Sequence, residues 1–247
     1  MEIYLAPEHV YHLVAQLSIE VGRDRVEQKK VNLVAGTVGA LFSQPKPDDI
    51  RLVSVENRLE PFWLVSAASR TVYDRTRTYL VTAGGPEVKS VTLLGQEQAV
   101  TPQVKGAPTL SLNAVEHCTQ ELHASHTFDG LSGQKADLMK YVNLPKTEIA
   151  DVNEFRPQGV LVVPPQVSAT AVVRQVTADV VQPVLSAQVI HQERVDIDTI
   201  ELDFRPVYAF EYEWVSKAKK VVIEIDAVTG ELHTGGKKWS DQIKGIV

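Results

Sequence analysis

The chain has 247 residues, with 25 Lys and Arg against 31 Asp and Glu, so its formal net charge is −6. A hydrophobic share of 44% beside 23% charged residues is ordinary for a globular protein and excludes a disordered or collagen-like chain. The acidic balance disfavours nucleic acid as a partner, because nucleic-acid binding draws on clustered positive charge.

The single cysteine, Cys118, excludes an intrachain disulfide framework. Glu2 and Glu8 stand where a secretory signal would carry Lys or Arg, and no apolar stretch approaches the roughly 20 residues that cross a bilayer. We therefore expect a cytoplasmic protein without a membrane partner.

Residues 1–30 hold a short amphipathic run and then a charged stretch from Arg23 to Lys30. Neither has a counterpart later in the chain. We interpret residues 1–30 as an appended N-terminal element.

The clearest organising feature is an internal echo. The pattern apolar-x-x-apolar-Glu-x-x-apolar-x-Pro-apolar-aromatic occurs over residues 52–63 and again over 197–208, at a constant offset (206 − 61 = 145). A fixed offset of this kind predicts a duplicated unit, and a chance resemblance of two half-buried strands is the alternative.

Each copy follows a segment rich in Val, Ala and Leu that predicts a helix, at residues 31–42 and 167–190. In the second segment Val172, Val176, Val180 and Val184 recur every four residues, as one buried helix face requires. Pro183 predicts a kink or a break, and the β-branched content leaves a strand as the alternative.

Strands follow both copies. In the first half they cover residues 61–73, 77–82 and 88–94, with a turn at Gly84-Gly85-Pro86. In the second half a strand with one aromatic face is followed by a Lys-rich turn, a returning strand at 221–226, a turn closed by Gly230 and a last strand at 231–234. The aromatic face consists of Tyr208, Phe210, Tyr212 and Trp214. We interpret it as the core beneath a helix, and a stacking platform for single-stranded nucleic acid is the alternative.

These elements predict an α+β fold of two related modules, each a helix packed on an antiparallel sheet. The first module covers residues 31–142 and the second 166–247. The Pro-rich segment 143–165 is the predicted linker between them.

The hairpin over residues 208–234, with its Asp226-Ala-Val-Thr-Gly-Glu231 turn, resembles the end of a PepSY-type repeat. The resemblance is best over residues 166–236. It implies a small cystatin-like α+β module associated with binding or inhibition, often of peptidases, and it carries no catalytic residues to this chain.

The one concentration of metal-ligand chemistry is formed by His117, Cys118, His123 and His126. Thiolate and imidazole are ligands that zinc prefers, so these four residues are a candidate metal site. In a strand, positions 117 and 118 would face opposite sides, whereas in a helix His123 and His126 would be neighbours. A solvated polar strand or loop is the alternative.

Paired acids suggest acid-base chemistry only weakly. Glu211 and Glu213 share one face of the aromatic strand, and we expect that face to be a solvated outer surface. Glu56 and Glu201 hold equivalent places in the two copies. Neither a nucleophile elbow nor a phosphate-binding glycine loop occurs in the sequence.

We therefore expect a non-enzymatic protein-binding or scaffold protein with a protein partner and no cofactor. The alternative is a metal-dependent enzyme or a zinc-stabilised domain that uses the cluster from His117 to His126.

Overall fold

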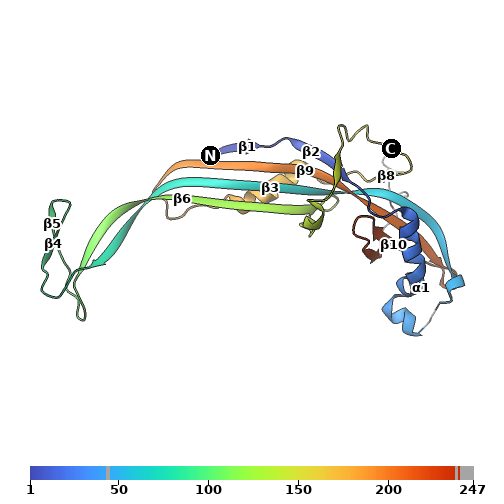
Figure 1. The fold of residues 1–247 in the computed structure, drawn as a ribbon, viewed down its shortest axis with the longest axis horizontal. Helices are drawn as coiled ribbons and strands as arrows, with labels where there is room; N and C mark the ends of the chain where they lie inside the picture. The colour runs from blue at the N-terminus through green and yellow to red at the C-terminus, as the bar shows by residue number, and fades with distance from the viewer. Residues whose placement is uncertain (43–44, 237–238, 240–247) are drawn as a thin grey trace. The chain divides into compact units, whose positions relative to one another are not determined.

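The computed structural model describes residues 1–42, 45–236 and 239, with side chains omitted for 37–42 (Figure 1). The protein is mostly β, with 51% of residues in strands and 17% helical. The described chain contains the helices α1 (Ile19–Phe42) and α2 (Ala169–Val180) and three single 3-10 turns, Pro47–Asp49, Met139–Tyr141 and Val215–Lys217. The strands are β1 (Glu2–Leu5), β2 (Glu8–Leu13), β3 (Ile50–Thr82), β4 (Ser90–Leu93), β5 (Gln96–Ala99), β6 (Thr109–Asp129), β7 (Lys146–Glu148), β8 (Leu161–Val162), β9 (Val189–Trp214), β10 (Lys219–Asp226) and β11 (Leu232–Thr234).

Nine of these strands form one mixed sheet, and β4 and β5 form a separate hairpin. The main path through the sheet is β11-β10-β9-β2-β7, with β3 paired to β9, β6 and β8, and β1 paired to β9. The pairs β2 with β9 and β3 with β8 are parallel, whereas β9 with β10, β10 with β11 and β2 with β7 are antiparallel.

The predicted α+β fold of two helix-on-sheet modules is wrong. The two echoed segments lie on β3 and β9, which pair with each other inside one sheet. A segment with alternating apolar positions buries its apolar face equally well on a neighbouring strand of the same sheet. The echo therefore marks two adjacent strands and not two separate modules.

The chain divides into two compact units. The first unit consists of residues 1–4, 68–123 and 178–196, and the second consists of residues 5–67, 124–177 and 197–247. The segment predicted as a linker, 143–165, lies within the second unit, where β7 pairs with β2 and β8 pairs with β3.

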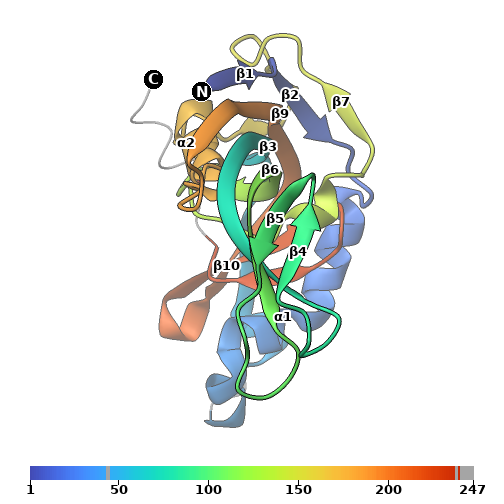
Figure 2. The same ribbon diagram turned by 90° about the vertical axis from the view of Figure 1, so that its left-hand side faces the viewer.

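The core of the second unit lies between α1 and the aromatic face of β9. Phe210 and Tyr212 are fully buried there together with Val26 of α1. Figure 2 shows α1 beside β10, the strand that pairs with this part of β9. The Tyr208 hydroxyl donates to the backbone carbonyl of Leu17 at 2.8 Å. The interpretation of the aromatic stripe as core beneath a helix is confirmed.

The covering helix begins earlier than predicted. α1 starts at Ile19, where the Ser18 hydroxyl accepts a hydrogen bond from the Val21 amide, and it takes in residues 19–30 of the predicted N-terminal element. Gly36, with φ of 71°, interrupts its helical geometry. The charged run from Arg23 to Lys30 lies on this helix. Most of its side chains are exposed, whereas Val26 is 0% exposed and Glu27 accepts a hydrogen bond from the Tyr212 hydroxyl.

The C-terminal hairpin follows the prediction closely. Phe210 of β9 pairs with Ile223 of β10, and Ile225 pairs with Leu232 of β11. In the second turn Asp226 Oδ1 accepts hydrogen bonds from the next backbone amides, and Gly230 takes the left-handed φ of 76°. An Asp that caps the turn and a Gly that reverses it are local signals, so the sequence predicts this hairpin well.

The valine stripe of α2 is confirmed for three of its four predicted members; the fourth, Val184, lies beyond the end of the helix and is only partly buried. Val172, Val176 and Val180 are at most 1% exposed. The helix ends at Val180, so the break comes before Pro183. No helix in the described part of the chain is long and apolar enough to span a membrane.

In the first unit β3 lies between β6 and β9, and β1 pairs with the far side of β9. The predicted turn at Gly84-Gly85-Pro86 is present, and β4 and β5 then form a hairpin in which Leu94 and Gly95 take positive φ. Both described hydrophobic core clusters belong to the second unit. Within the first unit Tyr73, Leu110 and Val195 are buried, and side-chain pairs connect its strands.

Candidate functional site

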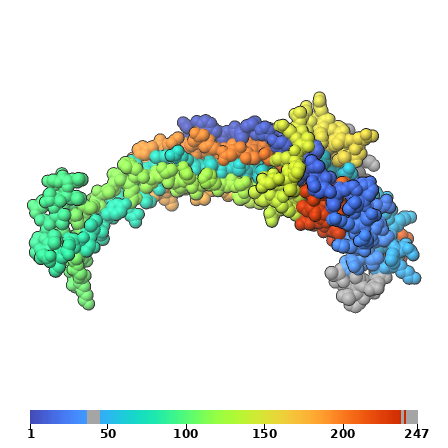
Figure 3. All heavy atoms as spheres, in the orientation of Figure 1, coloured from blue at the N-terminus to red at the C-terminus, as the bar shows by residue number. Residues whose placement is uncertain are grey.

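The first unit presents a long unpaired strand edge along β6. β6 pairs with β3, and within the described ranges no other strand pairs with its opposite side. Short bridges close its two ends, from Thr109 to Thr101 and from Phe128 to Lys135. The part of the open stretch that lies in the first unit is residues 110–123, which we call the β6 edge; Figure 3 shows the atoms of β6 exposed along the sheet.

Three other edge strands of the sheet are short. β1 has 4 residues, and β7 and β11 have 3 each. Natural proteins keep exposed edges short or interrupt them with Pro, Lys or bulges, because a row of free N–H and C=O groups recruits another strand. The β6 edge contains no Pro, Gly or Lys, and its acidic residues are Glu116 and Glu121. It therefore lacks the short length, the prolines and the lysines that protect other edges.

Side-chain pairs hold β6 to β3. Arg70 reaches Glu121 at 3.6 Å, Asp74 meets His117 at 2.7 Å, and Thr78 donates to Asn113 at 2.7 Å. From one pair to the next the residue number rises on β3 and falls on β6, so the two strands run antiparallel. On the opposite face the Glu116 carboxylate accepts hydrogen bonds from Arg75 and Tyr79. The donors hold the pKa of Glu116 below its ordinary value, Tyr79 most strongly.

One carboxylate lies between two imidazoles on this sheet. Asp74 Oδ1 is 2.7 Å from His117 Nδ1, and Asp74 Oδ2 is 2.8 Å from His191 Nε2. The three residues come from three different strands, β3, β6 and β9. The hydrogen bond from His191, followed by that from His117, holds the pKa of Asp74 below its ordinary value. Each imidazole points at its own oxygen, so the group is a hydrogen-bonded bridge across the sheet.

The four predicted metal ligands lie on β6 and do not converge. His117 and His123 share an exposed face, but six positions along a strand is roughly 20 Å. Cys118 is on the opposite face, half-buried, with its thiol 3.7 Å from the Glu116 carbonyl. His126 belongs to the second unit, with its ring 6.2 Å from that of Phe128. In the part of the chain that the structure describes, no three His, Cys, Asp or Glu side chains are grouped to hold a metal ion.

A buried charge network crosses one face of the sheet in the second unit. Arg58 is fully buried and forms ion pairs with Glu60 at 2.8 Å, with Glu56 at 3.5 Å and with Glu224. Removing charges from water is costly unless each one is paired, and here each guanidinium nitrogen faces a carboxylate. Sequence reasoning singled out Glu56 from the echo but missed Arg58, since only the sheet brings its partners together.

The same network continues to Arg205. Its guanidinium contacts Glu60 at 2.8 Å and Asp226 at 3.4 Å, and the buried Tyr141 hydroxyl donates to Asp226 at 2.6 Å. Burial, followed by the hydrogen bond to Asp226, raises the pKa of Tyr141. These contacts tie β3, β9 and β10 to the 3-10 turn that contains Tyr141. The network therefore has a structural role in the second unit.

A further buried acid, Asp203, is separate from the network of Arg58 and Arg205. Asp203 on β9 is 0% exposed, and its Oδ1 lies 3.5 Å from Lys146 Nζ. Its Oδ2 is buried and has no hydrogen-bond donor among the described residues. Burial raises the pKa of Asp203 to about 6. Burial by itself lowers the pKa of the Lys146 ammonium group. The hydrogen bond to Glu201 and the charge of the neighbouring Asp203 outweigh burial and raise that pKa.

The other acids noted in the sequence are ion-paired. Glu211 is 8% exposed and not solvated as expected, and its carboxylate accepts from Ser54 at 2.9 Å. Glu213 pairs with Arg51 at 2.7 Å. Both are therefore salt-bridge or hydrogen-bond partners across the sheet.

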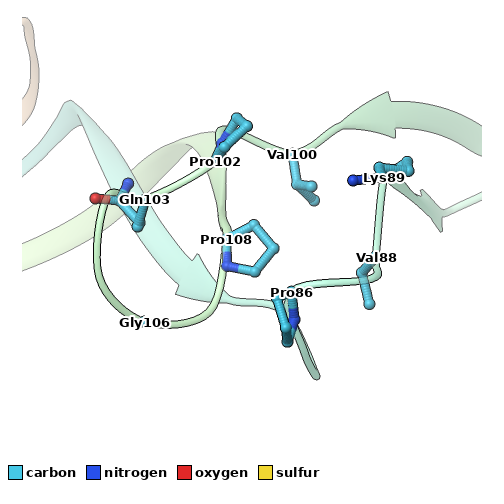
Figure 4. A pocket seen from close by; sticks show the side chains of 8 residues that line it. All are labelled: Pro86, Val88, Lys89, Val100, Pro102, Gln103, Gly106 and Pro108. Carbon is cyan, nitrogen blue, oxygen red and sulfur yellow. The ribbon is translucent and has the colours of Figure 1, made fainter.

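A shallow hollow lies beside the β4 and β5 hairpin (Figure 4). Lys89 is the one charged residue of its lining, which is otherwise formed by Pro86, Val88, Val100, Pro102, Gln103, Gly106 and Pro108. This lining offers apolar contact and one ammonium group.

The fold and the site together define a mostly-β protein with a long open strand edge. No family model, curated protein or solved structure matches this chain.

Proposed function

We propose that the protein is a non-enzymatic binding or scaffold protein and that the β6 edge is its main contact surface. The observation that carries the proposal is the length of this edge. An extended partner segment can add a strand to such an edge, where main-chain hydrogen bonds supply affinity and alternate side chains supply specificity.

The exposure of side chains along β6 supports the same role. On β6 the odd-numbered residues from Ser111 to His123 are exposed and the even-numbered ones from Leu112 to Leu122 are half-buried. Val115 is 55% exposed and the His117 side chain 80% exposed. An added strand would cover part of this surface and extend the strand ladder of the unit. The PepSY-like hairpin at the C-terminus supports a binding role as well.

Site-specific photocrosslinking in cells tests the proposal. A photoreactive amino acid replaces Val115 on β6, and a matched probe replaces Arg174, which is exposed on α2. The expected result is a discrete adduct at position 115 that is absent at position 174. Equal labelling at both positions, or no adduct at position 115, contradicts the proposal.

A further inference from the structure

We infer that the strand added to the β6 edge is β6 of a second copy of this chain, paired antiparallel about a two-fold axis. The inference rests on the proposed function and names the partner. It is carried by the open edge together with the self-complementary sequence around Cys118.

The symmetry restricts the register. A two-fold axis perpendicular to a sheet keeps each side chain on its own face, and residues directly opposite each other share a face. Each residue therefore lies opposite one of the same parity, and the residue on the axis lies opposite its own copy. The central part of the edge allows only a few such registers.

Side-chain chemistry selects among these registers. A register centred on Glu116 places two carboxylates opposite each other, and one centred on His117 does the same with two imidazoles; like charges directly opposite are destabilising. A register centred on Thr119 places Glu116 directly opposite Leu122 of the second copy, so a carboxylate lies against an apolar side chain.

The register centred on Cys118 opposes no like charges. It does pair Val115 with the Glu121 carboxylate, but on the exposed face of the strand, where the Glu121 side chain is 56% exposed to water, whereas the Glu116 and Leu122 pair of the Thr119 register lies on the half-buried face. Ala114 then faces Leu122 of the second copy, Glu116 faces Gln120, and Val115 faces Glu121. Residues 113–123, all in the first unit, pair with themselves without opposing like charges. Cys118 lies opposite Cys118 of the second copy, near the middle of the β6 edge.

This register has a direct chemical readout. Opposite residues in an antiparallel pair have Cα atoms about 4.5–5.5 Å apart, which is within the range that a disulfide spans. Diamide accepts two electrons and two protons from the two thiols, and an S–S bond then joins the copies. A shift of one residue in the axis moves each Cys118 away from its copy by roughly 7 Å along the strands, beyond that range.

The experiment uses the purified full-length chain. Sedimentation is expected to show a dimer, and diamide is expected to cross-link it through Cys118. A variant with Cys118→Ser and Leu122→Cys is expected to dimerise without cross-linking, because position 122 faces position 114. A monomer at every soluble concentration overturns the inference, and so does a dimer that cross-links through position 122 instead.

Charge variants at the axis supply the matched test. Cys118→Glu places two carboxylates opposite each other and is expected to weaken dimerisation by up to about fivefold, whereas Cys118→Ser leaves it unchanged. An equimolar mixture of Cys118→Glu and Cys118→Lys chains is expected to restore a mixed dimer, which a misfolded variant cannot do. Absence of that rescue, or a Cys118→Glu dimer of unchanged affinity, overturns the inference. A monomeric protein that still gives the Val115 adduct in cells overturns self-pairing alone and leaves the proposed binding role standing.

Discussion

Arg205 Nη2 donates a hydrogen bond to Glu60 Oε2 at 2.8 Å, and the two residues hold the same place in the echoed pattern. Each one directly precedes a proline, Pro61 on β3 and Pro206 on β9. The two copies of the pattern therefore meet at a position where one carries a carboxylate and the other a guanidinium. Arg205 also lies 3.4 Å from the buried Asp226, so one cation serves two acids.

Replacing Arg205 by Met is expected to lower the free energy of unfolding by about 3 kcal/mol, because Glu60 and Asp226 lose a cation inside the protein. Urea unfolding followed by circular dichroism measures the loss. Arg51→Met is the control: the Arg51 side chain is 70% exposed in its pair with Glu213, so its removal is expected to cost less than about 1 kcal/mol. Equal losses in the two variants would contradict the structural role of the buried network.

Gly230→Ala is expected to destabilise the second unit by about 1–2 kcal/mol. Gly230 has a φ of 76°, a conformation that is strained for any residue with a Cβ. A Cβ there would also lie 2.5 Å from the Arg25 side chain, which must move. Gly84→Ala is the control, because a Cβ at Gly84 meets nothing within 4 Å. Thermal unfolding compares the two variants, and similar midpoints would show that the turn does not depend on Gly230.

Local signals made part of the fold predictable. The C-terminal hairpin depends on a period of two, an Asp that caps its own turn and a Gly with positive φ, all within a few residues. The stripe of Val172, Val176 and Val180 is likewise a property of one segment. The start of α1 was missed because Val26 is a single inward residue in a long charged run, so the helix shows little apolar periodicity before residue 31.

The fold class and the site depend on long-range pairing, which one sequence does not display. Nothing local shows that β3 and β9 are neighbours, so the echo suggested two modules. Asp74, His117 and His191 likewise meet only because three strands are adjacent. The stretch from His117 to His126 drew attention as a ligand cluster, whereas its structural distinction is an edge without a partner. An edge is defined by what does not pair with it, and periodicity carries no such information.

Replacing His191 by Ala is expected to raise the pKa of Asp74 toward its ordinary value, because the hydrogen bond from His191 is the largest cause of its lowering. His117→Ala is expected to produce a smaller rise. The carboxyl carbon resonance of Asp74, followed by NMR through an acid titration, measures both. His233→Ala on β11, in the second unit, is the control and should leave the titration unchanged. An unchanged Asp74 titration in the His191 variant would mean that the bridge is not formed in solution.

The buried Asp203 contributes to the free energy of unfolding, and this contribution decreases as pH rises. Its pKa is about 6 in the folded protein and about 3.9 in an unfolded chain, so folding favours the protonated acid. The contribution is fully present below about pH 4 and is lost as pH rises through 6.

Asp203→Asn removes the titrating group while keeping its shape. The unfolding free energy of the variant relative to the natural chain should therefore rise by about 2–3 kcal/mol between pH 4 and pH 7 and then level off. Urea unfolding across this range measures the difference. A difference that does not change with pH would mean that Asp203 is ionised throughout, held by Lys146.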